Sequence, residues 1–117
     1  MISNKIYDLE ERTYHFARDS RFMIRLLPKT VSNIEDSKQL VRSSGSVGAN
    51  YIEANEKLGS KDFIMRLKIA HKEAKETRYW LKLLQDLNEQ HKEKLSELIK
   101  ESLELKKILS AIINKSS

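Results

Sequence analysis

The sequence contains no cysteine, a single proline and three glycines among its 117 residues. Without cysteine the chain forms neither disulfide bonds nor thiolate metal sites. No apolar run approaches the ~20 residues that a membrane-spanning helix requires, and the N-terminus lacks the basic and apolar segments of a secretory signal. We therefore expect a cytoplasmic protein with no bound metal, no cofactor and no membrane anchor.

The sequence is rich instead in helix-forming and charged residues. Charged residues make up 33% of the chain, Lys and Arg outnumber Asp and Glu by 22 to 17, and the net charge is +5. This composition is typical of an all-helical protein, and the β-branched alternation of strands is absent. The length predicts a single domain that covers residues 1–117. The positive charge permits acidic partners such as nucleic acid without requiring them.

Hydrophobic periodicity predicts four helices, over about residues 4–27, 32–58, 60–87 and 92–114. Pro28 ends the first helix, and Ser32 with Glu35 has the form of a capping box that begins the second. We expect Gly59 to close the second helix in the left-handed conformation and Ser60 to cap the third. Four long helices with short connections predict an antiparallel up-down-up-down bundle.

A run of small residues lies where the second helix should be. Residues 42–50 read RSSGSVGAN, a composition more typical of a loop. Apolar and small residues nevertheless keep helical spacing through the run, at positions 40, 44, 47, 51, 54 and 58. Each glycine costs a helix about 1 kcal/mol relative to alanine. We expect close approach of a second backbone to offset this cost, either within the bundle or from another subunit.

The third helix has more apolar surface than one bundle core requires. Besides the stripe that faces the bundle, it has a second stripe at Met65, Ile69, Trp80, Leu83 and Leu87. A helix that is apolar over so wide an arc is either central in its own fold or covered by another chain. The second stripe therefore predicts self-association, with a broad intramolecular core as the alternative.

Arg42, Ser46, Ala49 and Glu53 recur at spacings of four and three along the second helix, and Asn50 lies beside this line. A buried arginine requires carboxylate partners, because an unpaired buried charge is very costly. Glu73 and Glu76 on the third helix are the expected partners of Arg42. Together with Trp80, these residues are expected to form a network that fixes helix register or a subunit contact; a small charged pocket is the alternative.

Three segments resemble those of a known family, the four-helix bundle proteins named for 23S rRNA intervening sequences. The string QLVRSSGSVGANYIEA, at 39–54, resembles the second helix of that family. The family's third helix is similar to Asp62-Phe63 followed by IAHKEAKETRYWL at 69–81, and its first helix to Tyr7-Asp8-Leu9, Phe16-Ala17 and Leu27-Pro28. The resemblance covers about residues 5–87. One departure is Ala54, where many members have glycine.

The resemblance implies a homo-oligomer, which in known relatives is a ring of five subunits. A related group serves as accessory subunits of diversity-generating retroelements, where a basic pentamer engages a reverse transcriptase and nucleic acid. The resemblance thus implies a homopentameric scaffold or accessory protein whose partners are RNA, DNA or a nucleic-acid-processing protein. Kinship of fold alone does not establish such a function.

Two helix faces are candidate nucleic-acid-binding surfaces because they concentrate positive charge. The third helix has Lys61, Lys68, Lys72, Lys75 and Lys82 on one face, and the first has Arg18, Arg21 and Arg25. A basic stripe is the electrostatic footprint of phosphate binding, although an ordinary solvated helix face is the alternative. Because no common RNA-binding motif is present, we expect weak sequence specificity and strong salt dependence.

No constellation in the sequence predicts catalysis. The Glu-x-x-His pairs of di-iron bundles and the glycine loops that bind phosphate are both absent. Arg66 and His71 match the loose Arg-x4–6-His spacing of HEPN-type ribonucleases, in which such residues would supply charge stabilisation and proton transfer. So loose a spacing often arises by chance. We expect a protein that is not an enzyme, with a ribonuclease that uses Arg66 and His71 as the alternative.

Overall fold

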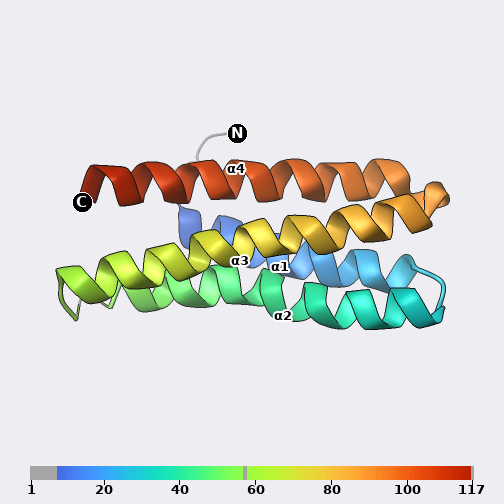
Figure 1. The fold of residues 1–117 in the computed structure, drawn as a ribbon, viewed down its shortest axis with the longest axis horizontal. Coiled ribbons are helices and arrows are strands. Elements are labelled where there is room, and N and C mark those ends of the chain that lie inside the picture. The colour runs from blue at the N-terminus through green and yellow to red at the C-terminus, as the bar shows by residue number, and fades with distance from the viewer. Residues whose placement is uncertain (1–7, 57, 117) are drawn as a thin grey trace.

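The computed structural model describes residues 8–56 and 58–116 and contains four helices in this part of the chain (Figure 1). They are α1 (Leu9–Leu26), α2 (Val31–Ala54), α3 (Ser60–Leu87) and α4 (Lys92–Ser116), with a short 3-10 helix, η2 (Glu89–His91), before α4. Successive helices run in opposite directions along the long axis of the molecule. The predicted all-helical, up-down-up-down four-helix bundle is therefore confirmed.

The order of the helices around the bundle places α1 and α3 at opposite corners. α2 packs against both α1 and α3, and α4 packs mainly against α3. Between α1 and α4, Arg12 donates hydrogen bonds from Nε and Nη2 to the two carboxylate oxygens of Glu101, at 2.7 and 2.9 Å. Within the described residues, no Cα atom of α1 lies within 8 Å of one of α3. The faces of α1 and α3 that point away from the core therefore point away from each other.

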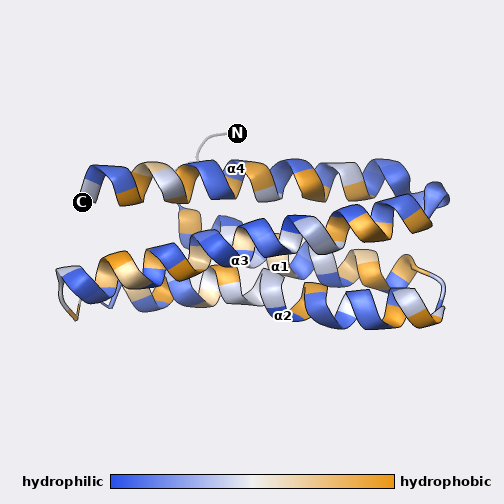
Figure 2. Ribbon diagram, in the orientation of Figure 1, coloured by the Kyte–Doolittle hydropathy of each residue, from blue (hydrophilic) through white to orange (hydrophobic). Residues whose placement is uncertain are grey.

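The core is one cluster of apolar residues from all four helices. Figure 2 shows that hydrophobic and hydrophilic residues alternate along each helix. The core residues with no exposed surface include Leu40, Val47, Leu67, Leu81 and Leu105. Small polar side chains also lie in the core, where they bond to the backbone of their own helix; Ser20, for example, donates to the carbonyl of Phe16 at 2.9 Å.

Several predicted helix boundaries are wrong. α1 begins at Leu9, where Asp8 caps it by accepting a hydrogen bond from the Glu11 amide at 3.1 Å; residues 4–7 lie outside the described part. α2 is capped by Thr30, whose Oγ1 accepts from the Asn33 amide at 3.2 Å, and not by a Ser32–Glu35 capping box. The earlier cap is fixed by Asn33, whose side-chain amide donates to the carbonyl of Pro28 at 2.9 Å.

The connection between α2 and α3 also differs from the prediction. α2 ends at Ala54 and does not reach Leu58, which is 79% exposed. Gly59 does not close α2 in the left-handed helical conformation; it has a positive φ of 138° with ψ 160° and is the N-cap of α3. Ser60, the predicted cap, is the first residue of α3. Because only glycine adopts this backbone conformation readily, Gly59 allows the sharp entry into α3.

The run of small residues at 42–50 is helical throughout, and Gly48 within it packs closely against α1. A Cβ atom at Gly48 would lie 2.9 Å from Thr13 Oγ1 and 3.2 Å from Thr13 Cβ. The expected close approach is therefore present, and the neighbour of Gly48 is a helix of the same bundle. Gly45 is less confined, because its Cβ would meet the end of the flexible Arg21 side chain at 3.3 Å.

Replacing Gly48 with alanine is expected to lower the free energy of unfolding. Overpacking typically costs about 1–3 kcal/mol and should outweigh the about 1 kcal/mol that alanine gains over glycine within a helix. Gly45→Ala is the matched control and should stabilise the protein, because the Arg21 side chain can move aside. Urea denaturation followed by circular dichroism measures both variants. Equal stabilisation by the two alanines would contradict the close contact at Gly48.

Candidate functional site

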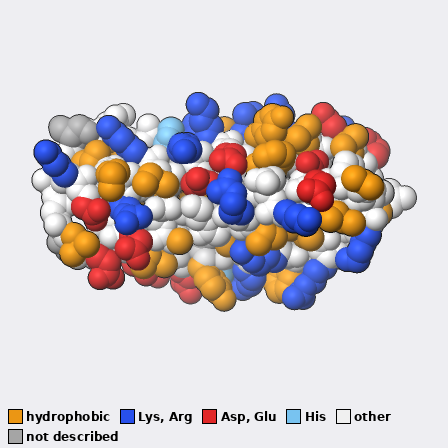
Figure 3. Space-filling model, turned by 60° about the horizontal axis from the view of Figure 1, so that its bottom comes forward, with side chains coloured by type: hydrophobic (Ala, Val, Ile, Leu, Met, Phe, Trp, Pro, Cys, Tyr) orange, Lys and Arg blue, Asp and Glu red, His pale blue; other side chains and the backbone are white. Residues whose placement is uncertain are grey.

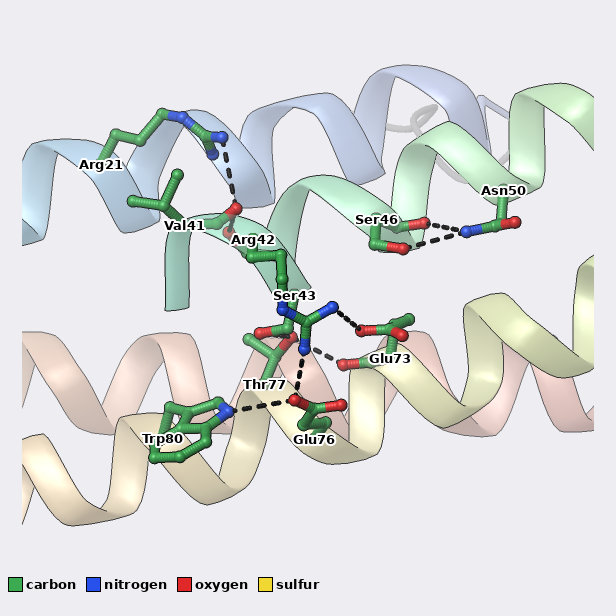
Figure 4. A network of polar contacts seen from close by, with 11 residues as sticks. Arg21, Val41, Arg42, Ser43, Ser46, Asn50, Glu73, Glu76, Thr77 and Trp80 are labelled. Atoms are coloured by element: carbon green, nitrogen blue, oxygen red, sulfur yellow. Dashed lines mark hydrogen bonds and ion pairs between the residues drawn. The ribbon is translucent and has the colours of Figure 1, made fainter. Parts of the chain in front are cut away.

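The centre of the α2–α3 interface contains a charged network (Figure 4). Arg42 of α2 points toward α3, where its Nη2 donates to Glu76 Oε2 and its Nη1 lies 3.5 Å from Glu73 Oε1. Glu73 is only 7% exposed, whereas the Arg42 side chain is 52% exposed. The expected pairing of Arg42 with both glutamates is therefore confirmed, and it lies within one chain.

The network continues along α3 through hydrogen bonds. The indole Nε1 of Trp80 donates to Glu76 Oε2 at 3.3 Å, so one carboxylate oxygen accepts from both Arg42 and Trp80. The Thr77 hydroxyl lies 2.7 Å from the Glu73 carbonyl and 2.9 Å from the Ser43 hydroxyl. The sequence did not predict the hydrogen bond between Thr77 and Ser43, because a small hydroxyl residue in a helix does not indicate a partner on another helix.

Asn50 belongs to a second, separate cluster. Its amide nitrogen donates to the carbonyl and hydroxyl oxygens of Ser46, at 2.9 and 3.0 Å, and its Oδ1 accepts from Arg66 Nη1 at 3.3 Å. Arg66 also lies 3.8 Å from Asp62 of the same helix. Glu53 is exposed, and within the described residues no hydrogen bond or ion pair joins its side chain to either cluster. The predicted single network is thus two clusters, neither of which includes Glu53.

The charged network pairs two carboxylates of α3 with an arginine of α2. Glu73 and Glu76 are directed toward Arg42 of α2. Lysines at positions 68, 72, 75 and 82 and a tyrosine at 79 have a spacing of four and three that places all five on one line of α3, and Glu76, four positions after Lys72, lies beside this line. With Lys61, these lysines form the lysine stripe, and each of them is exposed: Lys61, Lys68, Lys72, Lys75 and Lys82. From 68 to 82 this line contains no carboxylate.

The three predicted arginines of α1 are exposed but already contact neighbouring groups, Arg25 through the ring of Phe22. Arg18 pairs with Asp19 at 3.1 Å. Arg21 donates to the carbonyls of Ala17 and Val41, at 2.9 and 3.3 Å, and thus connects α1 to α2. Because α1 and α3 occupy opposite corners, these arginines and the lysine stripe do not form one patch on a single chain.

Arg66 and His71 face different neighbours. Arg66 contacts Asn50 of α2, whereas five residues later, about 140° around the helix, His71 lies near Lys106 of α4. Burial lowers the pKa of His71, and the positive charges of Lys106 and Lys75 lower it further. The two side chains are therefore not brought together as the ribonuclease alternative requires.

A space-filling view gives the overall character of one face of the molecule (Figure 3). Lys and Arg side chains recur along its length, with hydrophobic side chains between them and carboxylates in small groups. Within the described residues, no group of three or more His, Asp or Glu side chains is arranged to hold a metal ion. None of the described helices is long and apolar enough to cross a membrane.

These features define an all-helical bundle with an internal charged network and a solvent-facing lysine stripe. The family model described as 23S rRNA-intervening sequence protein matches residues 5–111. The chain belongs to this family, and the match extends the resemblance into α4.

A solved structure is also similar to the chain. It is a protein of unknown function from the S23 ribosomal protein family of Bacteroides thetaiotaomicron, 35% identical, with a TM-score of 0.78. The similarity covers 90% of this chain and 94% of that one. No curated protein matches the chain.

Replacing Arg42 with glutamine is expected to lower the free energy of unfolding by about 1–2 kcal/mol, because Glu73 would keep a buried charge without its cation. The expected loss is below the ~3–5 kcal/mol of a fully buried pair, since Arg42 is half exposed. In the double variant Arg42→Gln with Glu73→Gln, the free energy of unfolding should fall by less than the sum of the two single losses, because no buried charge is left without a partner.

Lys38→Gln is the matched control for this cycle. It removes a cation from the Lys38–Glu35 pair, whose side chains are 67% and 65% exposed, and should change the unfolding free energy by less than about 0.5 kcal/mol. Urea denaturation of the four variants measures the coupling. Additive losses at Arg42 and Glu73 would contradict a direct interaction between them.

Proposed function

We propose that the protein is a non-catalytic, homo-oligomeric scaffold or accessory subunit that binds RNA or DNA through the lysine stripe. The observation that carries this proposal is the line of exposed lysines on α3 from which carboxylates are absent between positions 68 and 82. A duplex or single strand that contacts such a line releases counterions, and this release supplies most of the affinity of sequence-independent binding. A cytoplasmic location and a nucleic-acid-processing protein as a further partner are part of the same proposal.

Self-association is supported by the second apolar stripe of α3. Met65 and Leu87, at its two ends, are 51% and 60% exposed. Between them, Ile69 and Leu83 are partly buried, and Trp80 packs against the core. The middle of the stripe is thus covered by the chain's own bundle, while its ends offer apolar surface to a second copy. In a pentameric ring the lysine stripe would be repeated five times, which would strengthen weak phosphate contacts through multivalency.

The separation of Arg66 and His71 supports a non-catalytic role. A ribonuclease that used them would need both side chains near one scissile phosphate. Arg66 instead contacts α2, and His71 lies near α4. The similar solved structure is of a protein with unknown function, so it supplies no activity that would argue against a non-catalytic role.

Reversing the charge of Lys68, Lys72 and Lys75 to glutamate should lower the affinity for nucleic acid by more than about tenfold at low salt. The matched control reverses three exposed lysines of α4, Lys100, Lys107 and Lys115, and so makes the same change in net charge. Electrophoretic mobility shift of a labelled RNA measures the affinity, and circular dichroism verifies the fold. Equal losses in both variants would overturn the lysine stripe as the binding surface.

The solution mass should be a multiple of the 13.7 kDa chain, and about 68 kDa if five copies assemble. Light scattering coupled to size exclusion measures it. Met65→Glu with Leu87→Glu should lower the mass, because charges would enter the contact between copies. Leu58→Glu, at a residue 79% exposed outside the stripe, is the control and should leave the mass unchanged. A monomeric wild-type protein would contradict the proposed assembly.

A further inference from the structure

Tyr79 is the one aromatic residue on the line of the lysine stripe. Its side chain is 58% exposed, and Lys75 and Lys82 lie four positions before it and three after it on the same line. Lys75 and Lys82 are separated by about 10 Å along the helix axis. That distance corresponds to about three nucleotides of a strand whose bases are stacked as in duplex DNA, where the axial rise is about 3.4 Å per phosphate. Tyr79 therefore presents an aromatic surface between two cations at the spacing of a short stretch of strand.

The orientation of the Tyr79 ring is held by the charged network. The rings of Tyr79 and Trp80 meet edge to face, with centroids 5.0 Å apart and planes at 81°. Trp80 is in turn held by its hydrogen bond to Glu76, and Glu76 by Arg42. An aromatic side chain that is already oriented loses little conformational entropy when a ligand stacks on it.

We infer that Tyr79 is a base-stacking residue and that the lysine stripe binds single-stranded nucleic acid in preference to duplex. This inference rests on the proposed function and adds that the nucleic acid bound is single-stranded. The bases of a duplex are stacked on one another, whereas those of a single strand are free to stack on an aromatic ring while neighbouring phosphates contact lysines. Such binding tolerates any sequence, since every base has a stacking face.

Phe22 on α1 is the comparable exposed aromatic residue and supplies a control. It is 50% exposed, and Arg18 and Arg25 place their guanidinium carbons 5.8 and 5.4 Å from its ring centroid. Those cation–π contacts already occupy the ring, and Arg18 is also paired with Asp19. Removing Phe22 therefore deletes an exposed aromatic of similar size, flanked by cations, at the opposite corner of the bundle.

The test compares wild type, Tyr79→Ala, Tyr79→Phe and Phe22→Ala for binding to a labelled uridine homo-oligomer and to an RNA duplex of equal length. Fluorescence anisotropy at low salt measures both affinities. Tyr79→Ala should weaken binding to the single strand by about 5- to 150-fold and leave duplex binding unchanged. Tyr79→Phe, which keeps the ring, and Phe22→Ala should both bind like wild type.

A second readout is internal to the protein. Trp80 is the single tryptophan of the chain and contacts Tyr79. Its emission should change when the single strand binds to wild type and should not change in Tyr79→Ala at saturating strand. Equal affinities of Tyr79→Ala and wild type, or equal losses for single strand and duplex, would overturn the stacking role while leaving the proposed function intact. No binding of either RNA to wild type would overturn both proposals.

Discussion

The interaction on which the rest of this structure depends is the pairing of Arg42 with Glu73 and Glu76. Glu73 is nearly buried between α2 and α3, where an unpaired carboxylate would be strongly destabilising. Arg42 supplies the compensating charge from its half-exposed position on α2. The same pairing neutralises Glu76, which lies beside the lysine stripe, and fixes its carboxylate, which accepts a hydrogen bond from Trp80. One arginine thus connects the packing of two helices to the charge that α3 shows to solvent.

The run of small residues explains why α2 can pack against both of its neighbours. Gly48 allows the backbone of α2 to approach Thr13 of α1, and Ser43, on another side of the helix, bonds to Thr77 of α3. A larger side chain at either position would separate the helices. A sequence that is typical of a linker is therefore a helix whose low intrinsic propensity is compensated by contacts on two sides.

The sequence predicted the four helices, their buried stripes and the partners of Arg42, because each depends on helical spacing or on the cost of an unpaired charge. It did not predict the start of α2. Ser32 and Thr30 are both acceptable caps, and the choice depends on Asn33, which bonds to Pro28 and to Asn88, 55 residues further along the chain. Nor did it separate Asn50 from the Arg42 network, since helical spacing places both on or beside one line without saying which side chain of α3 each one meets.

The central claim is that phosphate contacts come from the lysine stripe and that the charge of Arg42 is already neutralised. The slope of log affinity against log salt concentration, for single-stranded RNA, tests it most directly, because the slope counts the phosphate contacts. Lys72→Ala and Arg42→Ala each remove one cation. The account predicts that Lys72→Ala reduces the slope by about 0.7 unit, the contribution of one phosphate contact on a single strand, and that Arg42→Ala, compared while still folded, leaves it unchanged. An equal reduction by both, or affinity independent of salt, would contradict it.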